Sequence, residues 1–371
     1  MCYNYQNFLI DGDFMEKFQH GGQIYNSIGT AEKFFDFSAN INPLGLSEKI
    51  LQTLQENLRE IVNYPDSNAT ELKNAISRRY KIPEKNLILL NGAAEFFYLY
   101  FQVLRPKKIL LPVPTFSEYE RAAISAGCEV EYFFLQEEEN FQLDAEKILS
   151  QNADCIILGR PNNPTGNLIS IDAVKKISAK FPTVLDESFI DFLEIESAKN
   201  FARKNLVVVQ SLTKIFAIPG LRLGFAVAEK NLAEKFNAAK DVWNVNFLAH
   251  KAGVAALADE KFLSDTRTWL EVEKKFFVEQ LAKLPVKIFL PTVNFILFKV
   301  ESEKIAAEIL KQLRAEKILL RSCENFAGLD GRFLRSAIRS REENILLFNA
   351  LKKFFGVIKN DENNVGQART N

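Results

Sequence analysis

The sequence is poor in histidine and carries no excess of charge. Its 371 residues include only two histidines, His20 and His250. Neither HExxH nor GxSxG occurs, which argues against a histidine-rich metal site and a Ser-His-Asp triad, so no metal is expected. Lys plus Arg and Asp plus Glu both number 47, so no overall field attracts the chain to nucleic acid or to an anionic membrane. A bound anion must therefore be held by local groups.

Cysteine is also scarce, and the start of the chain has no long apolar run. The four cysteines (Cys2, Cys128, Cys155 and Cys323) form no CxxC pair, which argues against a zinc ribbon and fits unpaired thiols in a reducing compartment. The first thirty residues contain acids and no long apolar stretch, so they predict neither a signal peptide nor a membrane-spanning helix. We therefore expect a cytoplasmic protein.

Apolar side chains are abundant, at 47% of residues with 32 Phe, which is ample for a sizeable core. From about residue 86, short apolar runs alternate with longer amphipathic segments. The runs are LILL (87–90), KILLPV (108–113), EVEYFFL (129–135), CIILG (155–159), TVLDE (183–187), LVVVQS (206–211) and RLGFAVA (222–228). Several are apolar without alternation, as strands are when helices cover both faces of a sheet. The pattern predicts an α/β fold with a mainly parallel sheet.

The pattern changes after about residue 240. A long helical stretch, TRTWLEVEKKFFVEQLAKL, precedes VKIFLPTVNFILFKV, a helix from about 302 to 316, the short runs ILLRS and RFLRSAI, and a last helix near 341–355. This succession predicts a smaller α+β domain. The polar tail that follows is expected to be disordered.

Lys214 lies in SLTKIFAIPGLRLGF (211–225), directly after the apolar run LVVVQS. A lysine at the end of a buried strand is desolvated, loses proton affinity and becomes a usable amine nucleophile, whereas an ordinary lysine lies on the surface. Ser211 and Lys214 also fit the S-x-x-K signature of serine acyl-hydrolases. The S-D-N and K-T-G elements of that family do not occur, however, and Pro219 would interrupt the required helix. We therefore reject the acyl-hydrolase interpretation.

Three further stretches could carry chemistry. Asp186 ends the run TVL and would face a crevice at the carboxyl edge of the sheet, although a helix cap or a solvated acid explains it equally well. In LILLNGAAEFF, the small residues 92–94 would let backbone N–H groups approach an anion at a helix N-terminus, with tight packing as the alternative. In GRPNNPTGN, the paired Asn162 and Asn163 could donate hydrogen bonds from a rigid turn.

Taken in order, NGAAE, PTFSEY, PNNPTG, DESF, SLTK and GLRLG resemble the active-site series of fold-type I pyridoxal phosphate enzymes, the class I/II aminotransferase group. The match spans about residues 36–340, and the ordered set is far more specific than any single motif. The resemblance implies an α/β large domain with a mainly parallel central sheet and a smaller α+β domain. It divides the chain into an N-terminal arm with part of the small domain (1–46), a large cofactor-binding domain (47–240), a small C-terminal domain (241–356) and a tail (357–371).

The same resemblance implies roles for individual residues toward pyridoxal 5′-phosphate. Lys214 would form the Schiff base, Asp186 would pair with the pyridine nitrogen, and Asn163 would hold the phenolic oxygen of the ring. The remaining contacts would be a stacking Phe116 and a phosphate site made by Gly92, Ala93, Ala94, Ser211 and Arg222. Tyr64 matches a tyrosine that reaches the phosphate in the neighbouring subunit, which implies a homodimer with shared active sites. An aromatic side chain packed beside a proline turn is the alternative for Tyr64.

Two branches of the group compete, the histidinol-phosphate aminotransferases and the threonine-phosphate decarboxylases of cobalamin biosynthesis. HGGQIYN, FSANINPLG and CENFAGLDGRFLRSAIR resemble the decarboxylases, and Phe189 stands where aminotransferases usually carry a tyrosine. The resemblance thus favours decarboxylation of a small phosphorylated amino acid, O-phospho-L-threonine or O-phospho-L-serine, with the aminotransferase as the alternative. It assigns the substrate to Arg335 for the carboxylate and to His20, Gly22, Asn40 and Arg321 for the phosphate. A surface ion pair is the alternative for each arginine.

Four points stay open on the sequence, the first being which of Arg321 and Arg335 meets the carboxylate and which meets the phosphate. Phosphothreonine and phosphoserine differ by one methyl group, which is worth only about 1–3 kcal/mol in a pocket. Arg160 replaces the usual Asn before PNNPTG and would either add a cation near the site or face solvent. A binding protein that kept the fold without turnover is a third interpretation, and the joint retention of Lys214, Asp186, Asn163 and Arg222 argues against it.

Overall fold

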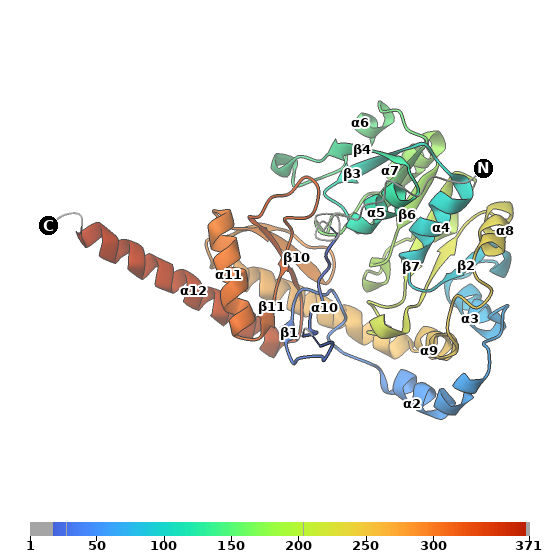
Figure 1. Ribbon diagram of the computed structural model, residues 1–371, viewed down its shortest axis with the longest axis horizontal. Coiled ribbons are helices and arrows are strands. Elements are labelled where there is room, and N and C mark those ends of the chain that lie inside the picture. The colour runs from blue at the N-terminus through green and yellow to red at the C-terminus, as the bar shows by residue number, and fades with distance from the viewer. Residues whose placement is uncertain (1–17, 27, 203, 369–371) are drawn as a thin grey trace.

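A seven-stranded sheet forms the centre of the larger part of the molecule (Figure 1). The computed structural model describes residues 18–26, 28–202 and 204–368, with side chains up to residue 356. The strands are β2 (Leu87–Leu90), β3 (Lys108–Val113), β4 (Glu129–Phe134), β5 (Cys155–Gly159), β6 (Thr183–Asp186), β7 (Leu206–Ser211) and β8 (Gly224–Val227), in the order β2-β8-β7-β6-β5-β3-β4. Only β8 runs antiparallel to its neighbours, β2 and β7. The predicted mainly parallel sheet is confirmed.

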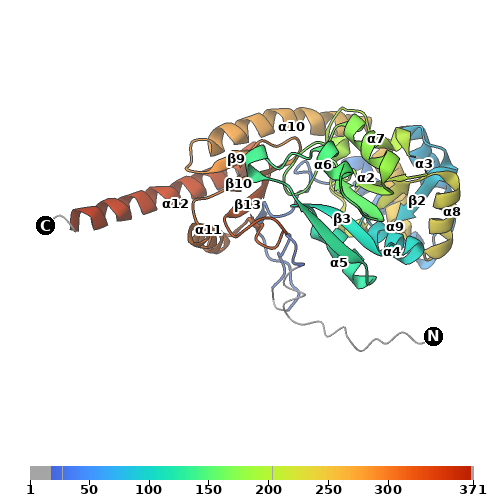
Figure 2. The same cartoon turned by 90° about the horizontal axis from the view of Figure 1, so that it is seen from above.

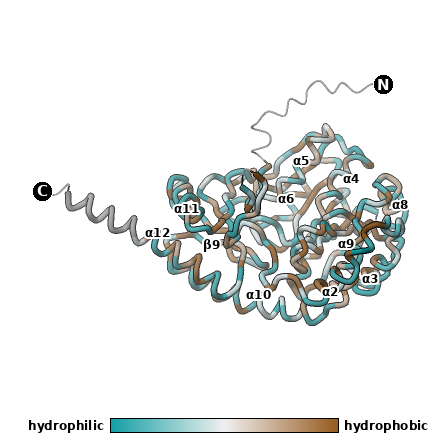
Figure 3. The backbone as a smooth tube through the Cα atoms, turned by 60° about the horizontal axis from the view of Figure 1, so that its bottom comes forward, coloured by the Kyte–Doolittle hydropathy of each residue, from teal (hydrophilic) through white to brown (hydrophobic). Residues whose placement is uncertain are grey.

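Helices cover both faces of this sheet, which explains why its strands are apolar without alternation. Along β7, Val207 and Val209 join one apolar cluster, whereas Leu206 and Val208 join another on the opposite face. The first cluster includes residues of α4 (Glu95–Leu104), α5 (Ser117–Ser125) and α8 (Lys230–Ala239). The second includes residues of α6 (Ala145–Leu149) and α7 (Ile171–Lys180). Figure 3 shows outer helices such as α10 alternating between teal and brown along their length.

The smaller part contains a four-stranded antiparallel sheet in the order β12-β13-β10-β9. Its strands are β9 (Lys287–Phe289), β10 (Phe295–Lys299), β12 (Arg321–Ser322) and β13 (Phe333–Ala337), and α11 (Glu303–Ala315) and α12 (Arg341–Ala368) accompany them. β1 (Phe35–Asp36) pairs in parallel with β11 (Ile318–Leu319), so a segment near the start of the chain joins this part. The predicted α+β character after residue 240 is confirmed.

One long helix, α10 (Glu260–Leu281), extends from the large part to the small part (Figures 1 and 2). At its large-domain end, α9 (Phe247–Leu257) packs against α2 (Glu48–Asn57) and α3 (Thr70–Tyr80). Short 3-10 helices lie at Leu58–Val62, Glu84–Asn86, Glu137–Glu139, Ile190–Phe192, Ala198–Phe201 and Pro219–Leu221. The division of the chain at residues 46, 240 and 356 stays a prediction.

The C-terminal helix is longer than its sequence pattern indicated. We expected it to end near residue 355 and residues 357–371 to be disordered, but α12 continues to Ala368. A polar composition argues against burial, whereas lysine, glutamate, glutamine and alanine remain compatible with a helical backbone. The expected end of the helix near residue 355 was therefore wrong, disorder of the tail stays a prediction, and residues 369–371 lie outside the described residues. Within the described ranges, no helix is long and apolar enough to cross a membrane.

Candidate active site

A cavity of about 320 Å³ lies at the edge of the large sheet where the carboxyl ends of its parallel strands meet. This is the edge at which open α/β sheets bind ligands. The cavity contains most of the residues predicted to hold the cofactor. Its lining comprises His20, Ala93, Ala94, Phe97, Phe116, Glu118, Tyr119, Arg121, Pro161, Asn163, Asp186, Ser188, Phe189, Thr213, Lys214 and Arg222.

Lys214 follows β7, and its side chain lines this cavity and is half-buried. Its Nζ donates to Ser211 Oγ at 3.1 Å. Burial lowers the pKa of Lys214 to about 8, and Arg222 adds to this effect while Asp186 opposes it. Asn42 anchors the loop, since its side chain donates to the carbonyl of Ile215 at 2.8 Å. The predicted loss of proton affinity is confirmed.

Asp186 ends β6 inside the cavity with 8% of its surface exposed. The Tyr119 hydroxyl donates to its Oδ2 at 2.7 Å, and the backbone N–H of Ser188 donates to its Oδ1 at 2.8 Å. Asp186 is therefore neither a helix cap nor a solvated loop acid. Burial and the neighbouring Asp186 charge raise the pKa of Tyr119 well above its ordinary value, so this hydroxyl remains a donor.

A group of potential anion donors, Ala93, Ala94 and Arg222, also lines the cavity. Gly92 has a φ of +78°, and a Cβ there would lie 2.3 Å from Arg222 Nη2. Glycine therefore serves two needs, the left-handed backbone and the close approach of the guanidinium. The turn Pro219–Leu221 returns the chain so that Ser211 and Gly224 face each other in register between β7 and β8. Arg222 is exposed, and its Nη1 donates to the carbonyl of Pro219 at 3.4 Å.

Asn163 and Arg335 meet beside the cavity. Nη1 of Arg335 donates to Asn163 Oδ1, and its Nη2 donates to the carbonyl of Ser38 at 2.7 Å. Burial lowers the pKa of Arg335 to about 10, and its Nε is buried without a partner. Arg321 lies directly opposite Arg335 in the β12–β13 register. Neither arginine is a surface ion pair, because both are buried.

The segment around residue 20 crosses between the two parts of the molecule. His20 Nε2 lies 2.8 Å from Glu118 Oε1 at the cavity, and Arg321 donates to the carbonyl of Gln19 at 2.7 Å. Gly22 donates its N–H to Ser38 Oγ at 2.8 Å. Asn40 is buried, and its Oδ1 has no partner. Of the residues predicted for the substrate, the structure thus brings His20 to the cavity wall, whereas Gly22, Asn40, Arg321 and Arg335 are not among the residues that line it.

Arg160 takes neither of the two positions considered for it. Its guanidinium forms a buried ion pair with Glu187 at 2.7 Å and donates to the carbonyl of Ile169 at 2.8 Å. Consecutive residues of a strand point to opposite faces, so Asp186 faces the cavity while Glu187 faces Arg160. Arg160 therefore contributes to the stability of the large domain and lies outside the cavity.

Tyr64 is not part of the cavity formed by its own chain. It is 78% exposed and stacks on Trp243 with ring centroids 4.4 Å apart. The proline-turn alternative does not account for this exposure, because the ring packs on Trp243 and leaves its outer face to solvent. The predicted role in a neighbouring subunit stays a prediction.

Sequence reasoning missed three polar residues of the cavity in the first turn of α5: Glu118, Tyr119 and Arg121. Glu118 accepts hydrogen bonds from His20 and from Tyr98 at 3.0 Å, and Arg121 lies 3.3 Å from it. These contacts lower the pKa of Glu118 against the opposing effect of burial. The signal was available in PTFSEY, because residues three apart share one helix face. Tyr119 therefore lies on the same side as Phe116.

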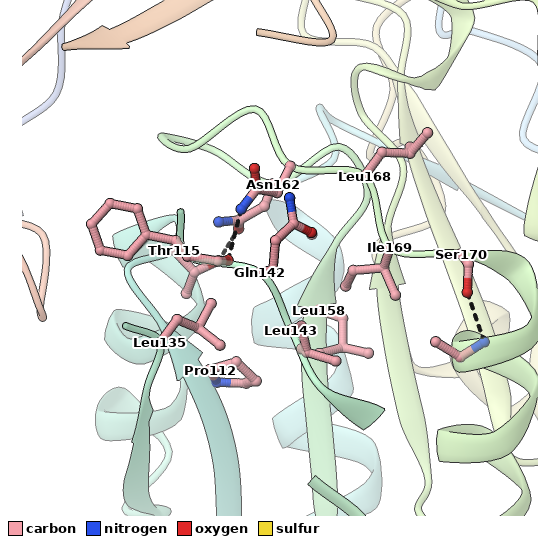
Figure 4. A pocket seen from close by; sticks show the side chains of 14 residues that line it. Pro112, Thr115, Leu135, Gln142, Leu143, Leu158, Asn162, Leu168, Ile169 and Ser170 are labelled. Carbon is pink, nitrogen blue, oxygen red and sulfur yellow. Dashed lines mark hydrogen bonds between the residues drawn. The ribbon is translucent and has the colours of Figure 1, made fainter. Parts of the chain in front are cut away.

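A second cavity of about 230 Å³ is lined by Asn162, the chain neighbour of Asn163, together with Thr115 and Gln142 (Figure 4). Asn162 lines this second cavity, donates to the carbonyl of Pro114 at 2.8 Å, and accepts from Thr115 at 2.7 Å. Its amide is therefore used to hold the turn, and Asn163 alone faces the first cavity. No cluster of histidine, cysteine or carboxylate side chains suited to a metal ion occurs in the part of the chain that the structure describes.

Comparison with known proteins places this geometry in context. The family model described as aminotransferase class I and II matches residues 32–350. The threonine-phosphate decarboxylase of Salmonella typhimurium is 37% identical over 349 residues, covering 90% of this chain and 95% of that protein. Curated histidinol-phosphate aminotransferases match at 26–32% identity.

Two solved structures superpose on most of the chain. The histidinol-phosphate aminotransferase from Clostridium acetobutylicum has a TM-score of 0.80 and 34% identity, covering 88% of this chain and 99% of that one. The L-threonine-O-3-phosphate decarboxylase from Porphyromonas gingivalis has a TM-score of 0.77 and 29% identity, covering 86% and 98%. The backbone alone therefore fits both reactions.

Proposed function

The chain belongs to the class I and II aminotransferase family, and on this premise we propose that it is a pyridoxal phosphate-dependent decarboxylase. Its substrate would be O-phospho-L-threonine or O-phospho-L-serine, and its product an amino-alcohol phosphate for the nucleotide loop of cobalamin. The observation that carries the proposal is the similarity to the Salmonella decarboxylase over nearly the whole length of both proteins. The histidinol-phosphate aminotransferase activity is the second candidate, since a solved structure with that name is 34% identical.

The residues of the cavity fit pyridoxal phosphate. The Arg222 guanidinium lies against Gly92 and lines the cavity together with Ala93 and Ala94, whose backbone N–H groups directly precede α4. A fork of this kind suits a phosphate. In the same cavity, the buried carboxylate of Asp186 requires a cation, and a protonated ring nitrogen would supply it. Phe116 would cover one face of the ring.

When bound, the cofactor supplies an electron sink for the bond that breaks at Cα. The protein's own contribution is to select that bond by orienting the substrate. Arg335 would bind the carboxylate through its unpartnered Nε, and His20 with Arg321 would bind the phosphate. Lys214, whose pKa of about 8 leaves its free amine mostly protonated near neutral pH, would deliver a proton from Nζ to Cα after carbon dioxide leaves.

Phe189 supports the decarboxylase over the aminotransferase. Its ring lines the cavity and packs edge-on against Phe295 with centroids 5.1 Å apart. A phenylalanine cannot donate a hydrogen bond to the ring oxygen, so Asn163 would be left to hold that oxygen. The segment HGGQIYN, which resembles the decarboxylases, supports the same choice, because it brings the His20 imidazole to the cavity wall.

We also propose a homodimer in which Tyr64 reaches the phosphate site of the partner subunit. The surface around Tyr64 is unusually apolar, with Ile61 56%, Val62 85% and Trp243 46% exposed. Contiguous exposed apolar surface marks interaction sites. Mixing Lys214→Ala and Tyr64→Ala proteins tests this, because a mixed dimer with shared sites regains one intact site. No recovered activity in proven mixed dimers would contradict it.

A cytoplasmic location fits the free, buried thiols of Cys128, Cys155 and Cys323, whereas Cys2 lies outside the described residues. Retention of a fluorescent fusion in a fraction free of membranes and secreted proteins is the expected result. Localisation outside the cytoplasm would contradict this proposal without affecting the catalytic one.

The decisive experiment incubates the cofactor-loaded protein with each phospho-amino acid and measures carbon dioxide and the amino-alcohol phosphate. We expect both products in equal amounts, with Lys214→Ala inactive. Formation of glutamate from 2-oxoglutarate and histidinol phosphate, without carbon dioxide from either phospho-amino acid, would establish the aminotransferase instead. If borohydride fixes no cofactor on Lys214, the binding-protein interpretation replaces both.

A further inference from the structure

The geometry points to Tyr119 as a positioning residue that holds Asp186 for its contact with the ring nitrogen of the cofactor. This inference rests on the proposed function, since it concerns the same cavity. Tyr119 itself would touch neither the substrate nor the reacting atoms. It would act through the carboxylate alone.

The contact between the two side chains is short and enclosed. The Tyr119 hydroxyl donates to Asp186 Oδ2 at 2.7 Å, and only 2% of Tyr119 is exposed. The backbone N–H of Ser188 fixes the other oxygen at 2.8 Å. With one donor on each oxygen, the carboxylate plane cannot turn without breaking a hydrogen bond. A rigid carboxylate is what a directional contact to a ring nitrogen requires.

The tyrosine ring is held as firmly as its hydroxyl. It packs against Phe97 with centroids 4.6 Å apart and stands perpendicular to Phe116, at 85° and 5.5 Å. The first turn of α5 therefore fixes both the ring that would stack on the cofactor and the donor that orients Asp186. Displacement of this turn would change both contacts together.

Electrostatics give the hydroxyl a second effect. Asp186 is nearly buried, and a buried carboxylate keeps its charge only when donors or cations compensate for lost water. Before cofactor binds, the charged groups facing it include Lys214, and the neutral hydroxyl of Tyr119 is one of its two direct donors. The hydroxyl thus stabilises a charged, correctly turned carboxylate in advance of binding.

Binding of two ring systems by the cofactor-free protein tests the inference. One is pyridoxal phosphate, and the other is its 1-deaza analogue, in which a carbon replaces the ring nitrogen. The variants are Tyr119→Phe, which removes only the hydroxyl, and Tyr100→Phe as a matched control. Tyr100 is also buried, at 3% exposure, but lies away from Asp186 on α4. Equilibrium affinity is measured by absorption, with thermal unfolding recorded in parallel.

Tyr119→Phe should weaken pyridoxal phosphate binding about tenfold, as expected for losing a hydrogen bond to a charged group, and should leave the affinity for the deaza analogue unchanged. Tyr100→Phe should change neither the affinity for pyridoxal phosphate nor the affinity for the deaza analogue. Equal weakening for both ring systems would overturn the inference, because the tyrosine would then support the cavity as a whole.

A second measurement keeps the test valid if Tyr119→Phe is unstable. In an Asp186→Asn background, adding Tyr119→Phe should cause no further loss of pyridoxal phosphate affinity. A further tenfold loss there would also overturn the inference. If the unsubstituted protein bound no pyridoxal phosphate, the proposed function itself would fail, which distinguishes the two outcomes.

Discussion

Replacing Gly92 with alanine should separate cofactor binding from folding. The new Cβ would lie 2.3 Å from Nη2 and 2.8 Å from Cζ of Arg222. Backbone atoms cannot yield easily, but the exposed end of an arginine side chain can. We therefore expect the Arg222 guanidinium to move away from the turn at residues 92–94 while the fold is kept.

Two free-energy terms follow from this displacement. A non-glycine residue in the left-handed region costs about 1 kcal/mol of unfolding free energy, which applies because Gly92 has a φ of +78°. Loss of the charge-assisted contact with the cofactor phosphate costs about 1.5–3 kcal/mol of binding free energy. That second term corresponds to roughly a 10- to 100-fold weaker affinity for pyridoxal phosphate.

Gly127→Ala is the matched control, since Gly127 has a φ of +72° and no atom within 4 Å of its added Cβ. Both variants should lose a similar amount of stability in denaturant unfolding. Only Gly92→Ala should lose cofactor affinity, measured by absorption titration of the cofactor-free protein. Unchanged affinity in Gly92→Ala would refute the assignment of Arg222 to the phosphate, and equal losses in both variants would show that backbone strain alone is responsible.

Three other predictions follow from the same contacts. The rate at which cofactor-free protein forms a covalent bond to pyridoxal phosphate at Lys214 should rise about tenfold per pH unit and level off near pH 8, because the neutral amine is the nucleophile. Mass spectrometry after borohydride treatment locates the bond. A rise in rate that continues to about pH 10 would contradict the lowered pKa of Lys214. Glu118→Gln should raise KM for the phosphorylated substrate with little change in kcat, since it weakens the hold on His20 without touching Lys214; a loss confined to kcat would contradict this. Arg160→Met should lower the free energy of unfolding by about 3–5 kcal/mol, because Glu187 is left buried and unpaired. Combining Arg160→Met with Glu187→Leu should restore most of the lost free energy of unfolding. Neither the single nor the double variant should lose cofactor affinity.

The strands and the strand-end residues could be predicted because their causes are local. An apolar run covered on both faces has few alternatives, so β7 and the position of Lys214 after it followed from LVVVQS. Only the direction of the Asp186 side chain stayed ambiguous. Successive residues of a strand point to opposite sides, so an error of one residue in the strand end reverses the predicted direction. The motif series then supplied what periodicity could not, namely which chemistry the strand ends share.

The contacts that sequence reasoning missed join residues far apart in the chain. Tyr119 and Asp186 are 67 positions apart in the chain. No local sequence pattern predicts that the start of α5 will face the end of β6. The position of Arg160, near the site or in solvent, stayed open for a related reason. Its partner Glu187 is 27 positions away in the chain, so the sequence around Arg160 does not indicate the buried ion pair. The turn also separates Asn162 from Asn163, which serve different cavities.

The cross-strand placement of Arg321 opposite Arg335 has a practical consequence. Like charges facing each other across two strands repel, and here both guanidiniums are largely removed from water. The repulsion is present whenever no anion lies between them. A purified sample is therefore expected to melt at a lower temperature in a chloride buffer than in phosphate or sulfate. Buffer composition becomes a variable to control when variants of this protein are compared by thermal unfolding.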